Sequence, residues 1–200
     1  MLKVVAKALI FKTPFNMTVN TGKIAKFRYY GLAPFEIEVI YSTLKGSFDT
    51  WEEQLPIEES SQYVSMVEIE FPIPFSESFF QFFTMERWYR VKGIIKEMKR
   101  RRGKKGIKAF LNFCGIVSEI KSQLIFSLTN KSNRQFEMGI EKIEYLVDII
   151  PLQLGALPPN TKEIIYSYDE VNFRWRPYAA IDNGGLDYFF KNNEWKENEH

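Results

Sequence analysis

Apolar and polar residues alternate with a period of two along the first part of the chain. Residues 25–29 alternate in this way, and residues 37–41 do so again after the turn-forming residues 31–34. Two alternating runs separated by a Gly/Pro turn are typical of a β-hairpin. Same-face pairing in such a hairpin places Arg28 opposite Glu38 on the polar side.

A further strand is predicted over residues 64–73, where apolar residues alternate with Glu68 and Glu70. Between this strand and the hairpin, residues 47–61 are acidic and rich in turn-forming types. Paired carboxylates can serve as a general acid and base. Nothing else at that spacing supports catalysis, so a solvated loop is the interpretation we adopt.

The period changes from two to between three and four after residue 75. Over residues 76–102 the apolar side chains recur at the spacing of one helix face. Ser76 or Ser78 is placed to cap the start of this helix, and Gly103 is placed to end it.

The second half of the chain returns to a period of two. Turn-rich segments separate short apolar runs, so we expect strands over residues 116–128, 136–140, 145–149, 162–168, 173–178 and 186–190.

This order of elements predicts a mainly β protein: a sandwich or jelly-roll-like arrangement of antiparallel sheets with one central basic amphipathic helix. One sandwich and two β units joined by the helix are both compatible with the pattern, and we favour two units. The expected units are an N-terminal β unit at 1–75, the helix at 76–105, a C-terminal β-sandwich unit at 106–190 and a polar tail at 191–200.

Charge is distributed unevenly along the chain. Residues 87–105 hold ten basic residues and one acidic residue, a net charge of +9, whereas the rest holds 17 basic and 24 acidic residues. A cationic helix on an acidic body indicates an anionic partner: another protein subunit, a nucleic acid or an anionic membrane surface. The expected contact residues are Arg87, Arg90, Lys92, Lys96, Lys99, Arg100, Arg101, Arg102, Lys104 and Lys105.

Aromatic residues make up 16% of the chain and supply further candidates. Trp88 and Tyr89 lie on the predicted basic helix, where an aromatic ring can stack on a base. Trp175 and Tyr178 lie on a predicted strand, where they pack in the core or, if exposed, anchor a protein interface. All four are therefore interface candidates.

Several chemistries are not expected. Cys114 is the single cysteine and His200 the single histidine, so we predict no intramolecular disulfide, metal site or histidine-based catalysis. No nucleophile elbow, phosphate-binding loop or dinucleotide fingerprint occurs. Asp182 and Asp187 flank a Gly-Gly turn, and a pair of carboxylates could serve a glycosidase. A solvated turn explains the same residues without catalysis. The chain is thus expected to be no enzyme and to use no cofactor.

These observations predict a non-catalytic structural protein that works through contacts with other subunits, of which a capsid- or tail-type virion component is the concrete form. The first alternative is a nucleic-acid-binding protein that uses residues 87–105, and the second is a carbohydrate- or ligand-binding β-sandwich that uses loops 47–61 and 169–187. Lys3 and Lys7 interrupt the apolar start of the chain. We therefore expect neither a signal peptide nor a membrane span, and an intracellular protein.

Overall fold

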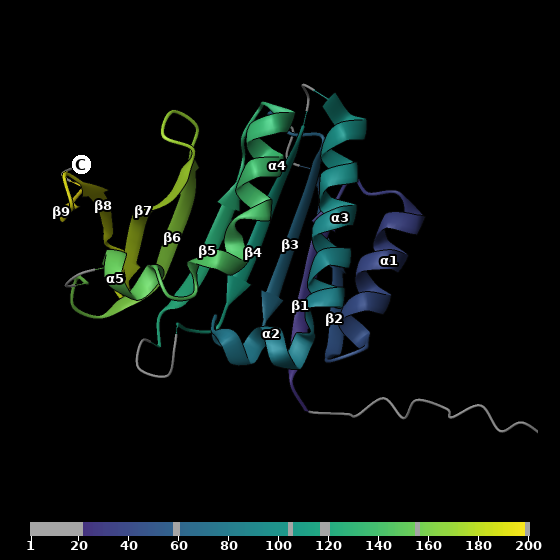
Figure 1. Ribbon diagram of the computed structural model, residues 1–200, viewed down its shortest axis with the longest axis horizontal. Helices are drawn as coiled ribbons and strands as arrows, with labels where there is room; N and C mark the ends of the chain where they lie inside the picture. The colour runs from purple at the N-terminus through teal and green to yellow at the C-terminus, as the bar shows by residue number, and fades with distance from the viewer. Residues whose placement is uncertain (1–21, 58–60, 104–105, 117–120, 155–156, 199–200) are drawn as a thin grey trace, which may run out of the picture.

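The computed structural model describes residues 22–57, 61–103, 106–116, 121–154 and 157–198. Strands and helices alternate through most of this length (Figure 1). In chain order they are β1 (Ile24–Tyr30), α1 (Pro34–Lys45), β2 (Asp49–Gln54), β3 (Ser65–Phe71), α2 (Glu77–Phe83), α3 (Met85–Arg102), β4 (Ile107–Phe113), β5 (Gln123–Leu128), α4 (Asn133–Glu141), the 3-10 helix η2 (Ile143–Leu146), α5 (Ile150–Leu154), β6 (Thr161–Asp169), β7 (Arg174–Asp182), β8 (Asp187–Lys191) and β9 (Glu194–Glu197).

The strands form one mixed sheet of nine, in the order β2-β1-β3-β4-β5-β6-β7-β8-β9. Three parallel pairs occur, β1 with β2, β3 with β4 and β5 with β6, and helices join the two strands of each pair. Antiparallel contacts link these pairs, and β6 to β9 continue as an antiparallel meander. Parallel neighbours need a crossover connection, which is why helices appear between those strands.

The helices cover one face of the sheet. α1, α3 and α4 lie side by side in front of the strands, with α2 and α5 on the same side nearer the strand ends (Figure 1). The core lies between the helices and the sheet. It includes five residues that are Cα partners of one another across the strands, and the side chain of each is fully buried: Phe27, Ile69, Leu111, Phe126 and Tyr166. The residues next to these in the same strands point to the opposite face, over which the described residues place no helix or strand (Figure 1), although Ser61 and Tyr63 cover Tyr30 at one end of it.

The predicted β-rich composition is confirmed, but the sandwich or jelly roll is not what the described strands form. They belong to a single sheet with helices on one side. Strands from the predicted units 1–75 and 106–190 pair directly, β3 with β4, and β9 lies in the predicted tail at 191–200. The sequence pattern located many strands correctly, but it carried no information on which strands would be neighbours.

The predicted hairpin partner of β1 is wrong. Residues 37–41 belong to helix α1, which starts with Pro34 in its first turn. Glu36 Oε2 accepts a hydrogen bond from the Ala33 backbone N–H at 2.8 Å, as in a capping box. Arg28 consequently pairs with Glu68 of β3, Nη2 to Oε1 at 2.6 Å, instead of Glu38. The local start signals of the helix outweighed the apparent alternation.

The single helix predicted over 76–105 is two helices. Ser76 Oγ accepts from the Phe79 N–H at the start of α2, as one of the two expected caps. Thr84, whose φ is 66°, separates α2 from α3. Gly103 follows α3 with a φ of 53°, which agrees with the predicted end of the helix.

Two predicted strands of the second half are helical. Residues 136–140 lie in α4, and residues 145–149 lie in and after η2. Phe136 and Ile140 are buried four positions apart, which suits a helix face as well as a strand face. Short apolar runs do not separate the two periods, so the pattern was ambiguous here.

Candidate binding site on the open face of the sheet

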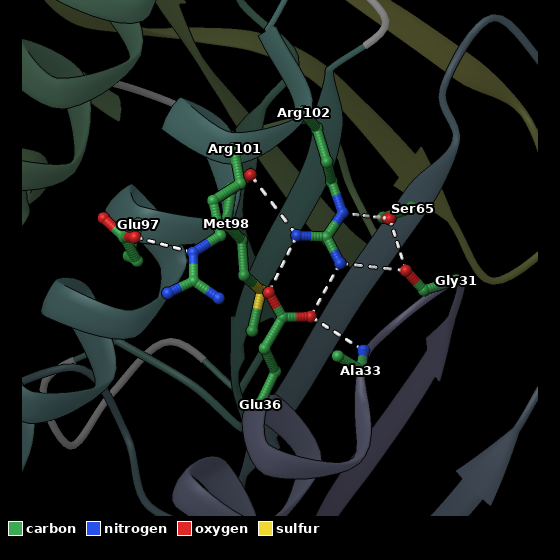
Figure 2. A network of polar contacts seen from close by, with 8 residues as sticks. All are labelled: Gly31, Ala33, Glu36, Ser65, Glu97, Met98, Arg101 and Arg102. Atoms are coloured by element: carbon green, nitrogen blue, oxygen red, sulfur yellow. Dashed lines mark hydrogen bonds and ion pairs between the residues drawn. The ribbon is translucent and has the colours of Figure 1, made fainter.

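The basic segment 87–105 is largely engaged within the chain. Arg102, at the end of α3, donates two hydrogen bonds to the Glu36 carboxylate, at 2.9 and 2.6 Å, and one to the Gly31 carbonyl at 2.9 Å. It also contacts the Ser65 hydroxyl (Figure 2). Burial raises the pKa of Glu36, but the Arg102 guanidinium and the Ala33 N–H lower it by more. Arg102 therefore connects α3 to the starts of α1 and β3.

Two lysines of the predicted binding set are buried. Lys92 Nζ donates to Glu141 at 2.8 Å and to Glu144 at 2.5 Å, and Lys96 pairs with Glu141 as well. Lys99 Nζ donates to the backbone carbonyls of residues 130 and 131, at 2.8 and 3.0 Å. Burial lowers the pKa of Lys99. These side chains connect α3 to α4, to η2 and to the turn that precedes α4.

The exposed end of α3 neutralises part of its own charge. Arg100 and Arg101 both hydrogen-bond to Glu97, at 2.6 to 2.8 Å. Hydrogen bonds from Arg100 and then Arg101 lower the pKa of Glu97 to about 2. Arg87 and Arg90 form no ion pair with another described residue.

Lys104 and Lys105 lie outside the described residues. Six of the ten predicted contact residues form hydrogen bonds or ion pairs within the chain: Lys92, Lys96, Lys99, Arg100, Arg101 and Arg102. Lys92, Lys99 and Arg102 therefore belong to contacts within the fold, whereas binding of an external anion by the cationic segment stays a prediction. The hydrogen-bond acceptors of the buried lysines and of Arg102 lie tens of positions away along the chain, so a count of local charge does not register them.

The four aromatic candidates separate into two kinds. Trp88 and Trp175 are buried, and their indole N–H groups donate to Glu144 at 3.1 Å and to the Gly139 carbonyl at 2.9 Å. They are core residues. Tyr89 and Tyr178 are about half exposed. Only Tyr178 of these two lies on the face of the sheet that the helices leave open, where it lines a hollow.

This hollow is the candidate site on the open face. It has a volume of about 560 Å³ and crosses β3 to β7. Apolar side chains and hydroxyl groups form its floor, and a carboxylate and an amide lie at one end; the lining residues are Glu68, Phe110, Asn112, Ile125, Ser127, Thr129, Ile165, Ser167 and Tyr178. The volume and the mixture of apolar surface with a few polar groups are typical of a binding site.

A polar cluster occupies the β3–β4 end of the hollow. Glu68 Oε1 accepts hydrogen bonds from Arg28 Nη2 at 2.6 Å and from Asn112 Nδ2 at 2.8 Å. Asn112 is only 3% exposed, yet among the described residues its Oδ1 atom has no hydrogen-bond donor and Arg28 Nε has no acceptor. Buried polar atoms without partners are uncommon in folded proteins, and two of those found among the described residues lie at this end of the hollow.

Several charged side chains on the open face are paired with one another. Lys26 Nζ lies 2.9 Å from Glu70 Oε1, next to the Arg28–Glu68 pair. Arg176 Nε lies 3.3 Å from an oxygen of Asp169 near the other end of the hollow. Within each of these three pairs the opposite charges compensate each other.

A signal for this site is present in the sequence, although the interface candidates named above did not draw on it. In residues 107–113, 123–128 and 161–169, apolar residues occur on both alternating sets of positions. Phe110, Ile125 and Ile165 are the apolar members of the outward set, and all three line the hollow. Outward apolar residues on neighbouring strands would have indicated a binding face.

The residues singled out in the predicted loops 47–61 and 169–187 have structural roles. Residues 49–54, within the predicted loop 47–61, form the edge strand β2. Asp182 Oδ1 accepts from the backbone N–H groups of Gly184 and Leu186, at 2.7 and 2.8 Å, as a turn carboxylate does. No cluster of three or more metal-ligating side chains occurs within the described ranges.

The search for similar proteins gives no match: no family model, curated protein or solved structure is significantly similar to this chain. Across the part of the chain that the structure describes, every helix is too short or too polar to cross a lipid bilayer.

Proposed function

We propose that this protein is a non-catalytic assembly protein and that the open face of its sheet is the surface through which subunits associate. The observation that carries the proposal is a nine-stranded sheet whose described helices all lie on one side, while the other side holds an apolar hollow with unsatisfied polar atoms. A capsid- or tail-type virion component remains its concrete form, because such proteins act through repeated subunit contacts.

The size of the open face supports this function. Strands about 4.8 Å apart make a nine-stranded sheet roughly 40 Å wide, and strands of this length extend about 20 Å. The face therefore offers at most about 800 Å², since Tyr30 and Met66 at one end of it are already buried; each partner of a stable protein interface contributes about that area. A second protein surface is therefore an occupant of the right dimensions.

The charge distribution favours a protein over the nucleic acid of the first alternative. Nucleic-acid binding depends on lysines and arginines that neutralise phosphates. Six of the candidates for that role are engaged within the chain, and the ion pairs of the open face compensate one another. A mixed surface of Phe110, Ile125, Ile165 and Tyr178 resembles the aromatic and aliphatic centre of protein interfaces.

Light scattering over a concentration series tests the proposal. We expect the wild-type protein to associate between about 1 µM and 1 mM, and Tyr178→Asp to weaken the association at least about tenfold. Tyr145→Asp is the matched control, because Tyr145 is 69% exposed on the helix-covered side. A wild-type protein that stays monomeric throughout, or equal weakening by both substitutions, would contradict the proposal.

The hollow also supports the second alternative, ligand binding, although of its lining residues only Tyr178 falls within the predicted loops 47–61 and 169–187. Its volume of about 560 Å³ and its hydroxyl, amide and carboxylate groups suit a small polar molecule. A carbohydrate panel screened by thermal unfolding tests this. A sugar that raises the melting temperature of the wild type and not of Tyr178→Asp would favour ligand binding, and no shift with any sugar would remove it.

A further inference from the structure

The strand register aligns one row of side chains across the hollow. Asn112 of β4 is the Cα partner of Ile125, and Ile125 is the partner of Ile165 of β6. Ile165 in turn is the partner of Ala179, which follows Tyr178 in β7. Asn112 and Tyr178 therefore lie at nearly the same height along the strands, at opposite ends of the hollow, with two isoleucines between them.

Tyr178 owes its position to an irregularity in β7. Ile165 pairs with Ala179 and Tyr166 pairs with Pro177, so that Tyr178 has no partner in β6. An extra residue of this kind is a β-bulge, and bulges redirect side chains. Tyr178 is 54% exposed, whereas Pro177 and Ala179 are buried. Its ring rests edge-on against Phe189, 5.7 Å away between centroids, so the exposed tyrosine is supported from one side.

We propose that two copies of this chain pack open face against open face about a two-fold axis that runs parallel to the strands between β5 and β6, so that Tyr178 of the partner subunit enters the hollow beside Asn112. This inference rests on the proposed function and names its partner and its contact. Strands β4 and β7 lie equally far from the gap between β5 and β6. A rotation about that axis therefore superposes β7 of one copy on β4 of the other.

The register makes this superposition chemically specific. Because Asn112 and Tyr178 share one row, the rotation moves each tyrosine over an asparagine without a shift along the strands. Ile125 meets Ile165 of the partner subunit at the centre, and the reverse contact follows by symmetry. Isologous contacts of this type close at two subunits.

The phenolic hydroxyl is a donor that suits the carboxylate at the polar end of the hollow. Stacked sheets lie about 10 Å apart, a gap that a tyrosine on one sheet and a short side chain on the other can bridge. The acceptor that a partner subunit can reach at that end is the Glu68 carboxylate, since the Glu68 side chain is 17% exposed whereas Asn112 Oδ1 is buried. A tyrosine O–H is a donor and its ring is apolar, so it matches both that acceptor and the floor formed by Phe110 and Ile125.

Ion pairs lie on both sides of this contact and do not disfavour it. The Lys26–Glu70 and Arg28–Glu68 pairs lie on β1 and β3, and Arg176–Asp169 lies where β6 leads into β7. Each pair is neutral in itself, so bringing two identical faces together adds no large like-charge repulsion.

Site-specific photo-cross-linking tests the geometry. The photoreactive amino acid p-benzoylphenylalanine replaces Tyr178 in the full chain, and isotopically labelled and unlabelled protein are mixed so that mass spectrometry separates links between copies from links within one. We expect links between copies that join position 178 to residues 110–112. The same replacement at Tyr145 is the control, and we expect no link between copies there.

The outcomes separate this inference from the proposed function. If light scattering shows dimers and position 178 links to other segments, or to nothing, the two-fold arrangement is wrong while assembly stands. If the protein stays monomeric, both are wrong. A second variant, Tyr178→Phe, removes only the hydroxyl and is expected to raise the dimer dissociation constant about three- to tenfold, whereas Tyr145→Phe leaves it unchanged. An unchanged constant for Tyr178→Phe would contradict the hydrogen bond at the polar end of the hollow.

Discussion

Arg102 and Glu36 form an ion pair with two parallel hydrogen bonds, although 66 positions separate them in the chain. Only 13% of the Arg102 side chain and 2% of the Glu36 side chain are exposed. The pair connects the last residue of α3 to the first turn of α1, where the Ala33 N–H also contacts the carboxylate (Figure 2). A residue that we predicted to bind an external anion thus holds two helices together.

Replacing Arg102 is expected to destabilise the fold strongly. Arg102→Met leaves the Glu36 carboxylate buried without its cation, and loss of one partner of a buried pair costs about 3–5 kcal/mol. Urea unfolding followed by circular dichroism measures the change. Arg101→Met in the same helix is the matched control and should cost less than about 1 kcal/mol, because that side chain is 48% exposed. Equal losses for the two variants would contradict this role of Arg102.

The same pair should make stability depend on pH. The pKa of Glu36 in the folded protein lies below its ordinary value of 4.5. An acid of this kind contributes stability that is fully present above its unfolded pKa and is lost as the pH falls through its folded pKa. We expect the free energy of unfolding to decrease from about pH 4.5 downwards.

Glu36→Gln should flatten that decrease, since the amide does not titrate. Glu38→Gln, at an exposed position of the same helix, should leave the pH dependence as it is in the wild type. Urea unfolding at half-unit steps of pH provides the comparison. A wild-type curve that is flat below pH 4.5 would count against the ion pair.

The lysines that join α3 to α4 should differ in their effects. Lys92 is 1% exposed and Glu144 only 7%, so Lys92→Met leaves a buried carboxylate unpaired and is expected to cost about 3 kcal/mol. Lys96 is 33% exposed and its partner Glu141 is 45% exposed, so Lys96→Met should cost about 1 kcal/mol or less. Thermal and urea unfolding of both variants measure the difference. The prediction is wrong if Lys96→Met proves the more damaging substitution.

Gly31 is expected to tolerate no side chain. Its φ is +64°, and a Cβ atom there would lie 2.1 Å from the Val64 carbonyl oxygen. Gly31→Ala therefore combines left-handed strain of about 1–2 kcal/mol with a backbone clash. Gly185→Ala is the control, with a φ of +82° and open space around the added atom. We expect Gly31→Ala to lower the free energy of unfolding well beyond Gly185→Ala, and similar values for the two would contradict the clash.

Features that depend on neighbouring residues were predictable from the sequence. The period-two runs at 25–29 and 64–73 are strands, Ser76 caps a helix and Gly103 follows the end of one. Alternation and capping arise between residues a few positions apart, so the local sequence shows both partners of each interaction. The failures at residues 37–41 and 136–140 occurred where a short apolar run satisfied both periods.

The candidate site was less predictable from the sequence. Tyr178 was identified as an interface candidate, whereas Glu68, Phe110 and Asn112 were not. Their role depends on β3, β4 and β7 being placed in one sheet with the helices all on the other side. That placement comes from pairing between distant segments, which no local pattern encodes.

By itself, the sequence determined that this protein is rich in strands, carries a cluster of cations near its middle and has no recognisable catalytic motif. Tertiary structure decided what those charges do and which surface remains open. Local periodicity and capping arise from interactions a few residues apart, so they are present in the sequence. The burial of Lys92, Lys99 and Arg102 and the exposure of one sheet face arise from contacts between segments far apart, and only the folded chain brings these together.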